Sequence, residues 1–175
     1  MKKYFAYGSN MPLFDMQSRC PDAKPLGAWT LPDHKLYFAG VADVVPCDGN
    51  DVVGVLWEIS QDDEWKLDYY EGYPLLYEKY WYEDVLFYRM TEIVEDPSEL
   101  YLSDFYVNTM LLGYDNFDID RTTLFRNMGY PIIADCLERY RDGQLTLEEA
   151  TAGSGMELEH FRGIAELMIS EEDSP

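Results

Sequence analysis

The stretch at residues 4–11 constrains the fold of this chain more than any other, because an aromatic run breaks there abruptly into Gly-Ser-Asn. Tyr4 to Tyr7 is aromatic and apolar, which is typical of a buried strand. Gly8 permits backbone angles that a side chain forbids, and Ser9 and Asn10 favour turns. The sequence therefore predicts a strand that ends in a tight loop. Such a loop exposes N–H groups that bind a carboxylate or a polarised carbonyl oxygen, although an ordinary β-turn is the alternative interpretation.

A second strong strand signal lies at residues 52–59, whose run of Val, Leu, Trp and Ile predicts a strand buried on both faces. The preceding residues 47–51 read Cys-Asp-Gly-Asn-Asp and predict a hairpin turn. Further upstream, residues 27–39 alternate well enough to indicate a pair of strands around Pro32-Asp33. These elements together predict a small sheet.

A helix is predicted directly after this strand. Ser60 fits the N-cap position, and Asp63 occupies the capping-box position. The helix is expected to stop near Gly72, with Pro74 preventing its continuation. Glu71 consequently lies at the C-terminal end of the helix, where the negative pole of the helix dipole disfavours a carboxylate.

The aromatic neighbours of Glu71 strengthen this effect. Tyr69, Tyr70 and Tyr73 are expected to shield the carboxylate from water, and both influences raise its pKa. A carboxyl group with a raised pKa suits a general base that works near neutral pH. The alternative interpretation of Glu71, taken by its position alone, is an ordinary solvated residue at a helix end.

Further strands and a helix follow in the second half of the chain. Residues 77–82 and 85–93 predict an aromatic hairpin that turns at Glu83-Asp84. Asp96-Pro97-Ser98 then opens another predicted helix, which is expected to end at Gly113. That helix is expected to direct five side chains to the core: Leu100, Tyr101, Phe105, Tyr106 and Met110.

Two short helices are predicted near the C-terminus, at residues 145–150 and 157–168, on either side of a turn at 153–156. This arrangement resembles a helix-turn-helix unit. Arg162 is the one Lys or Arg from residue 145 to the end, which disfavours contact with DNA. We therefore expect a module for packing or for homodimerisation.

The charge of the chain limits its partners. A net charge of −21, from 34 Asp and Glu against 13 Lys and Arg, argues against binding nucleic acid or an anionic membrane surface. The three cysteines, Cys20, Cys47 and Cys136, are widely spaced and form no Cys-x-x-Cys motif, so we expect a reduced, cytoplasmic protein without a metal. With only His34 and His160 available, a three-His metal site is excluded.

Three motifs recur together in this sequence: Tyr7-Gly8-Ser9-Asn10 after the first strand, Leu-Asp-Tyr-Tyr-Glu-Gly-Tyr-Pro at residues 67–74, and Tyr77 shortly afterwards. This combination resembles the γ-glutamylcyclotransferase-like family, also called the AIG2-like family. The likeness continues more weakly through Tyr88-Arg89-Met90 and through residues 97–120. It spans roughly two thirds of the chain, and the last part has no counterpart in the minimal family domain.

The resemblance implies a role for each matched residue. Glu71 falls on the general acid/base of the family, and Tyr77 and Tyr88 fall beside its substrate pocket. The loop that binds the γ-glutamyl unit through its backbone corresponds to Tyr7, Gly8, Ser9 and Asn10. Tyr77 and Tyr88 also fit buried strand positions, and a nucleophilic Ser9 would lack a base partner, so a structural or backbone-donor role is preferred for it.

The implied reaction needs no cofactor. In a γ-glutamyl amide the α-amine attacks its own γ-carbonyl carbon, closes the ring of 5-oxoproline and expels an amine or amino acid. The protein must remove the ammonium proton, stabilise the oxyanion and hold the substrate folded. We expect Glu71 to move the proton and the loop N–H groups to hold the oxygen atoms. A non-catalytic binding module for a small molecule or a protein is the alternative function.

The predicted fold is an α+β domain over residues 1–122, followed by a helical extension over residues 123–175. The domain is expected to hold a small mixed, strongly curved sheet or barrel with flanking helices, and the extension to hold the helix-turn-helix-like segment. The expected partner is a small γ-glutamyl substrate, without nucleic acid or membrane.

Overall fold

The computed structural model describes residues 1–92 and 104–169. Two compact units make up the chain, Met1–Ile119 and Asp120–Pro175. Among the described residues, the first unit contains the sheet and three helices, and the second contains helices. The predicted division after residue 122 falls at the beginning of the second unit.

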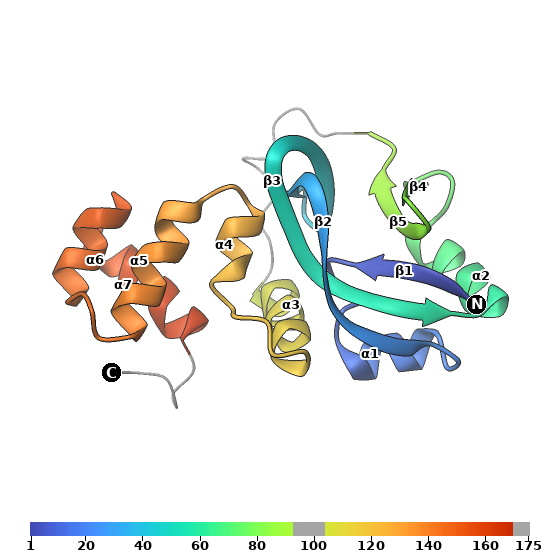
Figure 1. Ribbon diagram of the computed structural model, residues 1–175, viewed down its shortest axis with the longest axis horizontal. Helices are drawn as coiled ribbons and strands as arrows, with labels where there is room; N and C mark the ends of the chain where they lie inside the picture. Colours follow the sequence, from blue (N-terminus) through green and yellow to red (C-terminus); the bar gives the residue numbers. More distant parts are fainter. Residues whose placement is uncertain (93–103, 170–175) are drawn as a thin grey trace. The chain divides into compact units, whose positions relative to one another are not determined.

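The sheet of the first unit has five strands in the order β2-β3-β1-β5-β4 (Figure 1). The central strand β1 pairs antiparallel with β3 and parallel with β5, so the sheet is mixed as predicted. The strands span β1 (Lys2–Ala6), β2 (Lys24–Phe38), β3 (Ala42–Ile59), β4 (Tyr77–Tyr82) and β5 (Val85–Met90).

The two edge strands of this sheet approach each other through side chains. Neighbouring strands lie about 4.8 Å apart, so β2 and β4 would be separated by roughly 19 Å in a flat sheet. The ring centroids of Trp29 on β2 and Tyr82 on β4 are nevertheless only 6.1 Å apart. The sheet therefore curls toward the face that carries Phe5, whose ring centroid lies 5.1 Å from that of Trp29.

The prediction of a hairpin turn at residues 47–51 was wrong, because these residues lie inside the continuous strand β3. They form an irregularity in the ladder opposite Asp33, where the N–H of Gly49 donates to Asp33 Oδ1 at 3.0 Å. Turn-forming residues thus serve a bulge within a long strand pair. β2 is likewise one strand, and the chain reverses between β2 and β3 around Gly40, whose φ is +79°.

The prediction that residues 52–59 form a strand buried on both faces was correct for one face only. Val55, Trp57 and Ile59, which share one face of the last part of β3, are fully buried, whereas Leu56 and Glu58 on its other face are partly exposed. The strand therefore buries one face completely and the other in part. The predicted hairpin of β4 and β5 is confirmed, with Tyr77 opposite Met90 and Tyr82 opposite Val85.

Helix α2 (Gln61–Glu71) begins and ends as predicted. Ser60 Oγ accepts from the Asp63 N–H at 3.1 Å, and the Ser60 N–H donates to Asp63 Oδ2 at 3.1 Å, which completes the capping box. Gly72 ends the helix in the left-handed conformation, with φ at +66°. Together these caps place Glu71 in the last turn.

Helices α1 (Leu13–Arg19) and α3 (Asp104–Asn116) complete the first unit. The predicted start of α3 at Asp96-Pro97-Ser98 lies outside the described residues. The predicted end at Gly113 was wrong, because the helix continues to Asn116. A Cβ at Gly113 would lie 2.5 Å from Met11 Cβ, so this glycine permits close packing against the start of α1.

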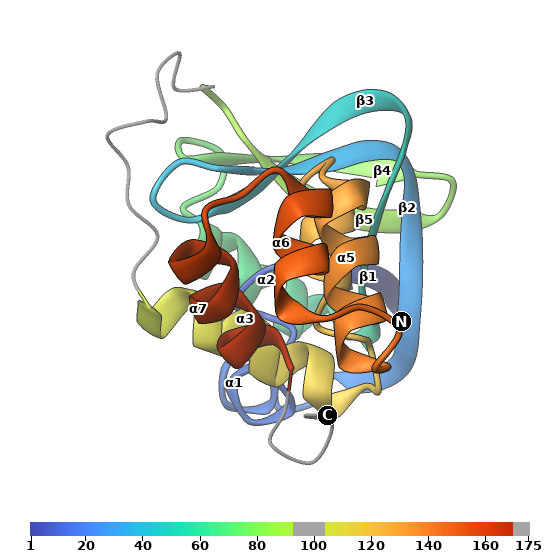
Figure 2. The same cartoon turned by 90° about the vertical axis from the view of Figure 1, so that its left-hand side faces the viewer.

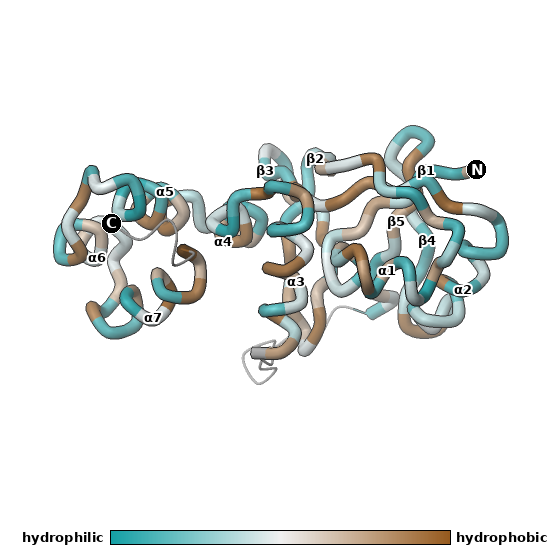
Figure 3. The backbone as a smooth tube through the Cα atoms, turned by 90° about the horizontal axis from the view of Figure 1, so that it is seen from below, coloured by the Kyte–Doolittle hydropathy of each residue, from teal (hydrophilic) through white to brown (hydrophobic). Residues whose placement is uncertain are grey.

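Apolar and polar residues alternate along the backbone of α3 (Figure 3). Met110, Leu111 and Tyr114 are buried, which agrees with the predicted inward direction of Met110. Phe105 was predicted to face the core but is 81% exposed. Its position in the first turn sets it on the side of the helix away from the buried residues.

The described part of the second unit contains the helices α4 (Thr123–Asn127), α5 (Pro131–Arg141), α6 (Leu147–Ser154) and α7 (Leu158–Met168), of which the last three are labelled in Figure 2. Its buried side chains include Leu137, Ala150 and Phe161. A second capping box, formed by Thr146 and Glu149, begins α6. The two helices predicted near the C-terminus are therefore present. Within the described residues, none of the helices has the length and apolar character required to cross a bilayer.

Candidate active site

The loop after β1 forms the tight turn that the sequence predicts. The Met11 N–H donates to the Gly8 carbonyl oxygen at 3.0 Å. A Cβ on Gly8 would lie 2.8 Å from Tyr106 Oη of α3. Tyr106 Oη in turn accepts hydrogen bonds from the backbone N–H groups of Ala42, at 3.0 Å, and of Ser9. A backbone donor of the loop thus faces a polar oxygen atom on the wall of a cavity.

This cavity has a volume of about 530 Å³ and is bounded by the loop after β1, by the face of the sheet that carries Tyr4 and Tyr88, and by α1, α2 and α3. All of the residues predicted as site residues line it, although they come from three elements and a loop. They are Tyr7, Gly8, Ser9, Asn10, Glu71, Tyr77 and Tyr88. Their roles in catalysis and substrate binding stay predictions.

Glu71 projects from the C-terminal end of α2 into the cavity, where Asn10 Nδ2 donates to its Oε1 at 2.7 Å. Burial raises the pKa of Glu71 from its ordinary value of 4.5 to about 7. The hydrogen bond from Asn10 and the positive charge of Arg19 oppose this rise without cancelling it. The raised pKa agrees with the prediction, and it allows the carboxyl group to accept and return a proton near neutral pH.

The predicted source of this burial was wrong in part. Tyr69 is 90% exposed and Tyr73 is 42% exposed, so neither covers the carboxylate. The side chains that surround it instead come from the strands and include Tyr4 and Tyr88, which are fully buried. Sequence neighbours in the last turn of a helix point in different directions, which explains the error.

Three phenol groups of the cavity wall are held by hydrogen bonds. Tyr7 donates to the backbone oxygen of Tyr88 at 2.7 Å, and Tyr77 donates to that of Ala42 at 3.1 Å. The hydroxyl of Tyr88 donates to Asp68 Oδ1 at 2.7 Å. Burial raises the pKa of each phenol well above its ordinary value. These groups therefore stay neutral and form a rigid, weakly polar wall around Glu71.

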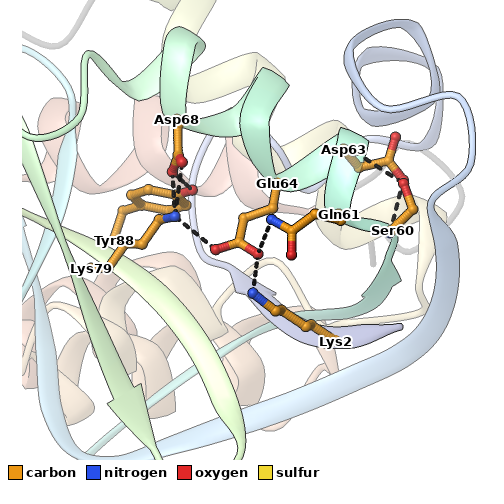
Figure 4. Close-up of polar contacts among 8 residues, drawn as sticks. All are labelled: Lys2, Ser60, Gln61, Asp63, Glu64, Asp68, Lys79 and Tyr88. Atoms are coloured by element: carbon orange, nitrogen blue, oxygen red, sulfur yellow. Dashed lines mark hydrogen bonds and ion pairs between the residues drawn. The ribbon is translucent and has the colours of Figure 1, made fainter.

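A chain of ionic contacts lies behind Tyr88 (Figure 4). Lys79 Nζ contacts Asp68 at 2.7 Å and Glu64 Oε1 at 2.7 Å. Lys2 completes the chain by contacting the other oxygen of Glu64. Because Asp68 accepts from Tyr88 while it is paired with Lys79, this network fixes the direction of the Tyr88 hydroxyl.

Among the described residues, the Ser9 hydroxyl is not paired with a general base. Its Oγ lies 3.2 Å from the Tyr70 hydroxyl, and no histidine lines the cavity. This arrangement favours the predicted role of Ser9 as part of the loop rather than as a nucleophile. Within residues 1–92 and 104–169, no group of three or more His, Cys, Asp or Glu side chains is arranged to hold a metal ion.

Sequence reasoning missed three residues of the site. Arg19 of α1 contacts Asn10, Tyr4 accepts a hydrogen bond from Asn10 at 2.9 Å, and the buried Asp43 accepts one from the Met90 N–H at 3.0 Å. A signal for Arg19 was present in the sequence, because the chain has only 13 Lys and Arg and Arg19 lies nine positions after Asn10 of the loop. Tyr4 and Asp43 carry no local signal, because strand pairing alone brings Tyr4 to the cavity and Asp43 to its place behind Tyr7 of the cavity wall.

Comparisons with known proteins agree with this architecture. The sequence model of the family described as "Gamma-glutamyl cyclotransferase, AIG2-like" matches residues 4–100. A solved structure described as "Gamma-glutamyl cyclotransferase" is 19% identical, with a TM-score of 0.56, over 95% of this chain and 98% of that chain. The uncharacterized protein loc79017 from Homo sapiens is 20% identical, with a TM-score of 0.55, over 94% and 97% of the two chains. These structural likenesses show the fold. A search of curated proteins found no match.

Proposed function

Because this chain belongs to the gamma-glutamyl cyclotransferase, AIG2-like family, we propose that it is an enzyme that releases 5-oxoproline from γ-glutamyl amides, with Glu71 as the general base and acid. The observation that carries the proposal is the position of Glu71. Its carboxyl group has a pKa of about 7 and lies in a phenol-lined cavity beside the loop of Gly8, Ser9 and Asn10.

The first step of the proposed reaction is removal of a proton from the α-ammonium group of the substrate by the ionised Glu71. The freed amine then attacks the γ-carbonyl carbon, so that a C–N bond forms and the carbonyl electron pair moves to oxygen. Backbone donors such as the Ser9 N–H are suited to hold this oxyanion. The Tyr106 hydroxyl accepts a hydrogen bond from that N–H, so this bond would have to break before the N–H could donate to the substrate.

The second step breaks the original amide bond. The oxyanion re-forms the C=O double bond, and the C–N bond to the leaving nitrogen breaks, with its electron pair going to that nitrogen. Glu71 transfers the protons lost by the attacking nitrogen to the leaving nitrogen and returns to its ionised form. The products are 5-oxoproline and the free amine or amino acid, and no water or cofactor enters the balance.

The test is an assay for 5-oxoproline with a panel of γ-glutamyl amino acids, γ-glutamyl amines and glutathione. We expect turnover of at least one of these classes, and we expect Glu71→Gln to lower kcat by about a thousandfold or more. Glu78→Gln is the matched control, because this exposed carboxylate lies on β4 outside the cavity. Failure of the folded wild-type protein on the whole panel would contradict the proposal and favour a binding module.

A further inference from the structure

Arg19, the last residue of α1, contacts the loop that carries Asn10. Its Nη1 donates to the Ser9 carbonyl oxygen at 2.6 Å and to Asn10 Oδ1 at 2.7 Å. Its guanidinium group lies 4.1 Å from the centroid of the Tyr70 ring, and its Nη2 lies 3.9 Å from Asp15 Oδ1. Contacts with two helices and the loop thus hold Arg19 in one place.

The contacts of Arg19 decide which way the Asn10 amide points. Asn10 Nδ2 donates to Glu71 Oε1 at 2.7 Å and to the Tyr4 hydroxyl at 2.9 Å, while Oδ1 accepts from Arg19. An amide rotated by half a turn would direct its NH₂ group at a guanidinium, which has only donors. The same rotation would direct its oxygen at the carboxylate of Glu71. Arg19 therefore excludes the rotated amide.

The fixed amide distinguishes the two oxygens of Glu71. Among the described residues, only Asn10 donates a hydrogen bond to this carboxylate, and it does so to Oε1. Oε2 is consequently the oxygen left to exchange protons with a substrate in the cavity. Because the Asn10 hydrogen bond also limits rotation of the carboxylate, it sets the direction from which Oε2 can act.

We propose that Arg19 is a positioning residue that locks the Asn10 amide so that Oε1 of Glu71 is held and Oε2 performs the proton transfers. This inference rests on the proposed function of Glu71. Arg19 does not touch the reacting atoms in this scheme. It acts through Asn10, and its charge has a second effect, since it lowers the pKa of Glu71 against the effect of burial.

Other ionisable groups around Glu71 do not supply this positive charge. The surrounding phenols have raised pKa values and stay neutral: Tyr4, Tyr7, Tyr77, Tyr88 and Tyr106. The nearby carboxylates are Asp15 on α1, Asp43 on β3 and Asp68 on α2. Two further cations lie beside them: Lys79 is paired with Asp68, and Arg89 faces Asp43. Arg19 is the one Lys or Arg among the described residues that line the cavity.

The first test measures the pKa of Glu71 without any substrate. A ¹³C NMR titration of protein labelled at its Glu carboxyl carbons identifies the signal of Glu71 by its absence from Glu71→Gln. In Arg19→Gln we expect the pKa of Glu71 to rise by about one pH unit, because an opposite charge is lost. Arg19→Lys keeps the charge, so in this variant the pKa of Glu71 should stay close to its wild-type value. Arg139→Gln, an exposed arginine of α5, controls for the change in net charge.

The second test separates positioning from charge. At a pH above the titration of Glu71, where the carboxylate is ionised in every variant, we expect kcat to fall about tenfold in Arg19→Gln, whose side chain can also accept from a rotated Asn10 amide, and to fall less in Arg19→Lys, which has only donors. Adding Arg19→Gln to Asn10→Ala should lower kcat no further, because Arg19 acts through that amide. Unchanged kcat, or additive losses in the double variant, would overturn the inference.

A merely structural role for Arg19 predicts a different pattern. Activity would then fall by the same factor at every pH, in step with the melting temperature, and the NMR pKa of Glu71 would stay at its wild-type value. That result also overturns the inference. A wild-type protein that releases no 5-oxoproline would refute the proposed function instead, and the NMR titration would still decide whether Arg19 acts on Glu71.

Discussion

Asn10 Nδ2 lies 2.7 Å from Glu71 Oε1, although 61 positions separate the two residues in the chain. This hydrogen bond joins the loop after β1 to the C-terminal end of α2. It gives the ionised carboxylate a donor that burial would otherwise deny it, so the pKa of Glu71 rises only to about 7. The loop therefore adjusts the proton affinity of the carboxyl group.

The first prediction concerns the pH dependence of activity. Glu71 must be ionised to accept a proton, so kcat/KM should fall about tenfold per pH unit below its pKa and level off above it. The midpoint of this acid limb is expected near pH 7, in accord with the pKa of about 7. Initial rates measured between about pH 5 and pH 9 locate the limb. A limb near 4.5, the ordinary value for Glu, would contradict an acid/base role for this residue.

The second prediction concerns stability, because a raised pKa is also a cost to folding. The unfolded chain ionises Glu71 near pH 4.5, whereas the folded protein does so near 7. Stability contributed by the neutral carboxyl is therefore complete below pH 4.5 and is lost as the pH rises to 7. Glu71→Gln, which is neutral at every pH, should exceed the wild type in free energy of unfolding above pH 7, by at most about 3 kcal/mol.

Urea unfolding of both proteins at acid and alkaline pH measures this difference. The advantage of Glu71→Gln should vanish at about pH 3, well below the unfolded pKa of Glu71, where both side chains are neutral in both states. Glu78→Gln serves again as the control, and its difference from wild type should stay small throughout. A variant that is less stable than wild type at alkaline pH would show that the ionised carboxylate is well accommodated.

Local signals in the sequence were sufficient for several elements of the site. The capping box of Ser60 and Asp63 and the left-handed Gly72 fix the ends of α2, and these ends depend on residues at or next to the helix termini. The position of Glu71 in the last turn follows directly. The turn at Gly8 was predictable for the same reason, because glycine and its polar neighbours act within a few residues.

Other features depend on contacts that no local pattern encodes. The residues around Gly49 have the composition of a hairpin turn, but the long pairing of β2 with β3 makes them a bulge opposite Asp33. Gly113 resembles a helix stop, but Met11 approaches it so closely that a side chain would collide. Arg19 reaches Asn10 only because α1 folds back beside the loop. Each of these outcomes is set by tertiary packing.

The third prediction tests the close approach at Gly8. In Gly8→Ala the new Cβ would lie 2.8 Å from Tyr106 Oη, so the phenol must move away from the Ser9 and Ala42 N–H groups. We expect KM for a γ-glutamyl substrate to rise about tenfold, with a stability loss of about 1–2 kcal/mol. Steady-state kinetics and urea unfolding measure the two effects.

Gly163→Ala is the matched control for this substitution, because no atom lies within 4 Å of a Cβ at that position of α7. Alanine should stabilise this helix by about 0.5–1 kcal/mol and leave KM unchanged. If Gly8→Ala also left KM unchanged, the loop would not approach the substrate as proposed.

The last prediction concerns the ionic network behind Tyr88. Lys79 contacts both Asp68 and Glu64, whose side chains are 20% and 5% exposed. Lys79→Met keeps the length of the side chain but removes the charge, so we expect a loss of roughly 2–3 kcal/mol in the free energy of unfolding at neutral pH. Burial alone would raise the pKa of Glu64, but the hydrogen bonds from Lys2 and Lys79 outweigh it and lower the pKa. The stability from this carboxylate is therefore present above its unfolded pKa of 4.5 and is lost as the pH falls below it.

The difference between wild type and Lys79→Met should accordingly shrink at acid pH, as urea unfolding at about pH 3.5 and pH 7.5 would reveal. Lys3→Met is the control, because its partner Asp84 is exposed and their ion pair is screened by water. This control should unfold close to wild type at both pH values. Equal losses in the two lysine variants, or a loss in Lys79→Met that does not depend on pH, would show that the network does not stabilise the wall of the cavity.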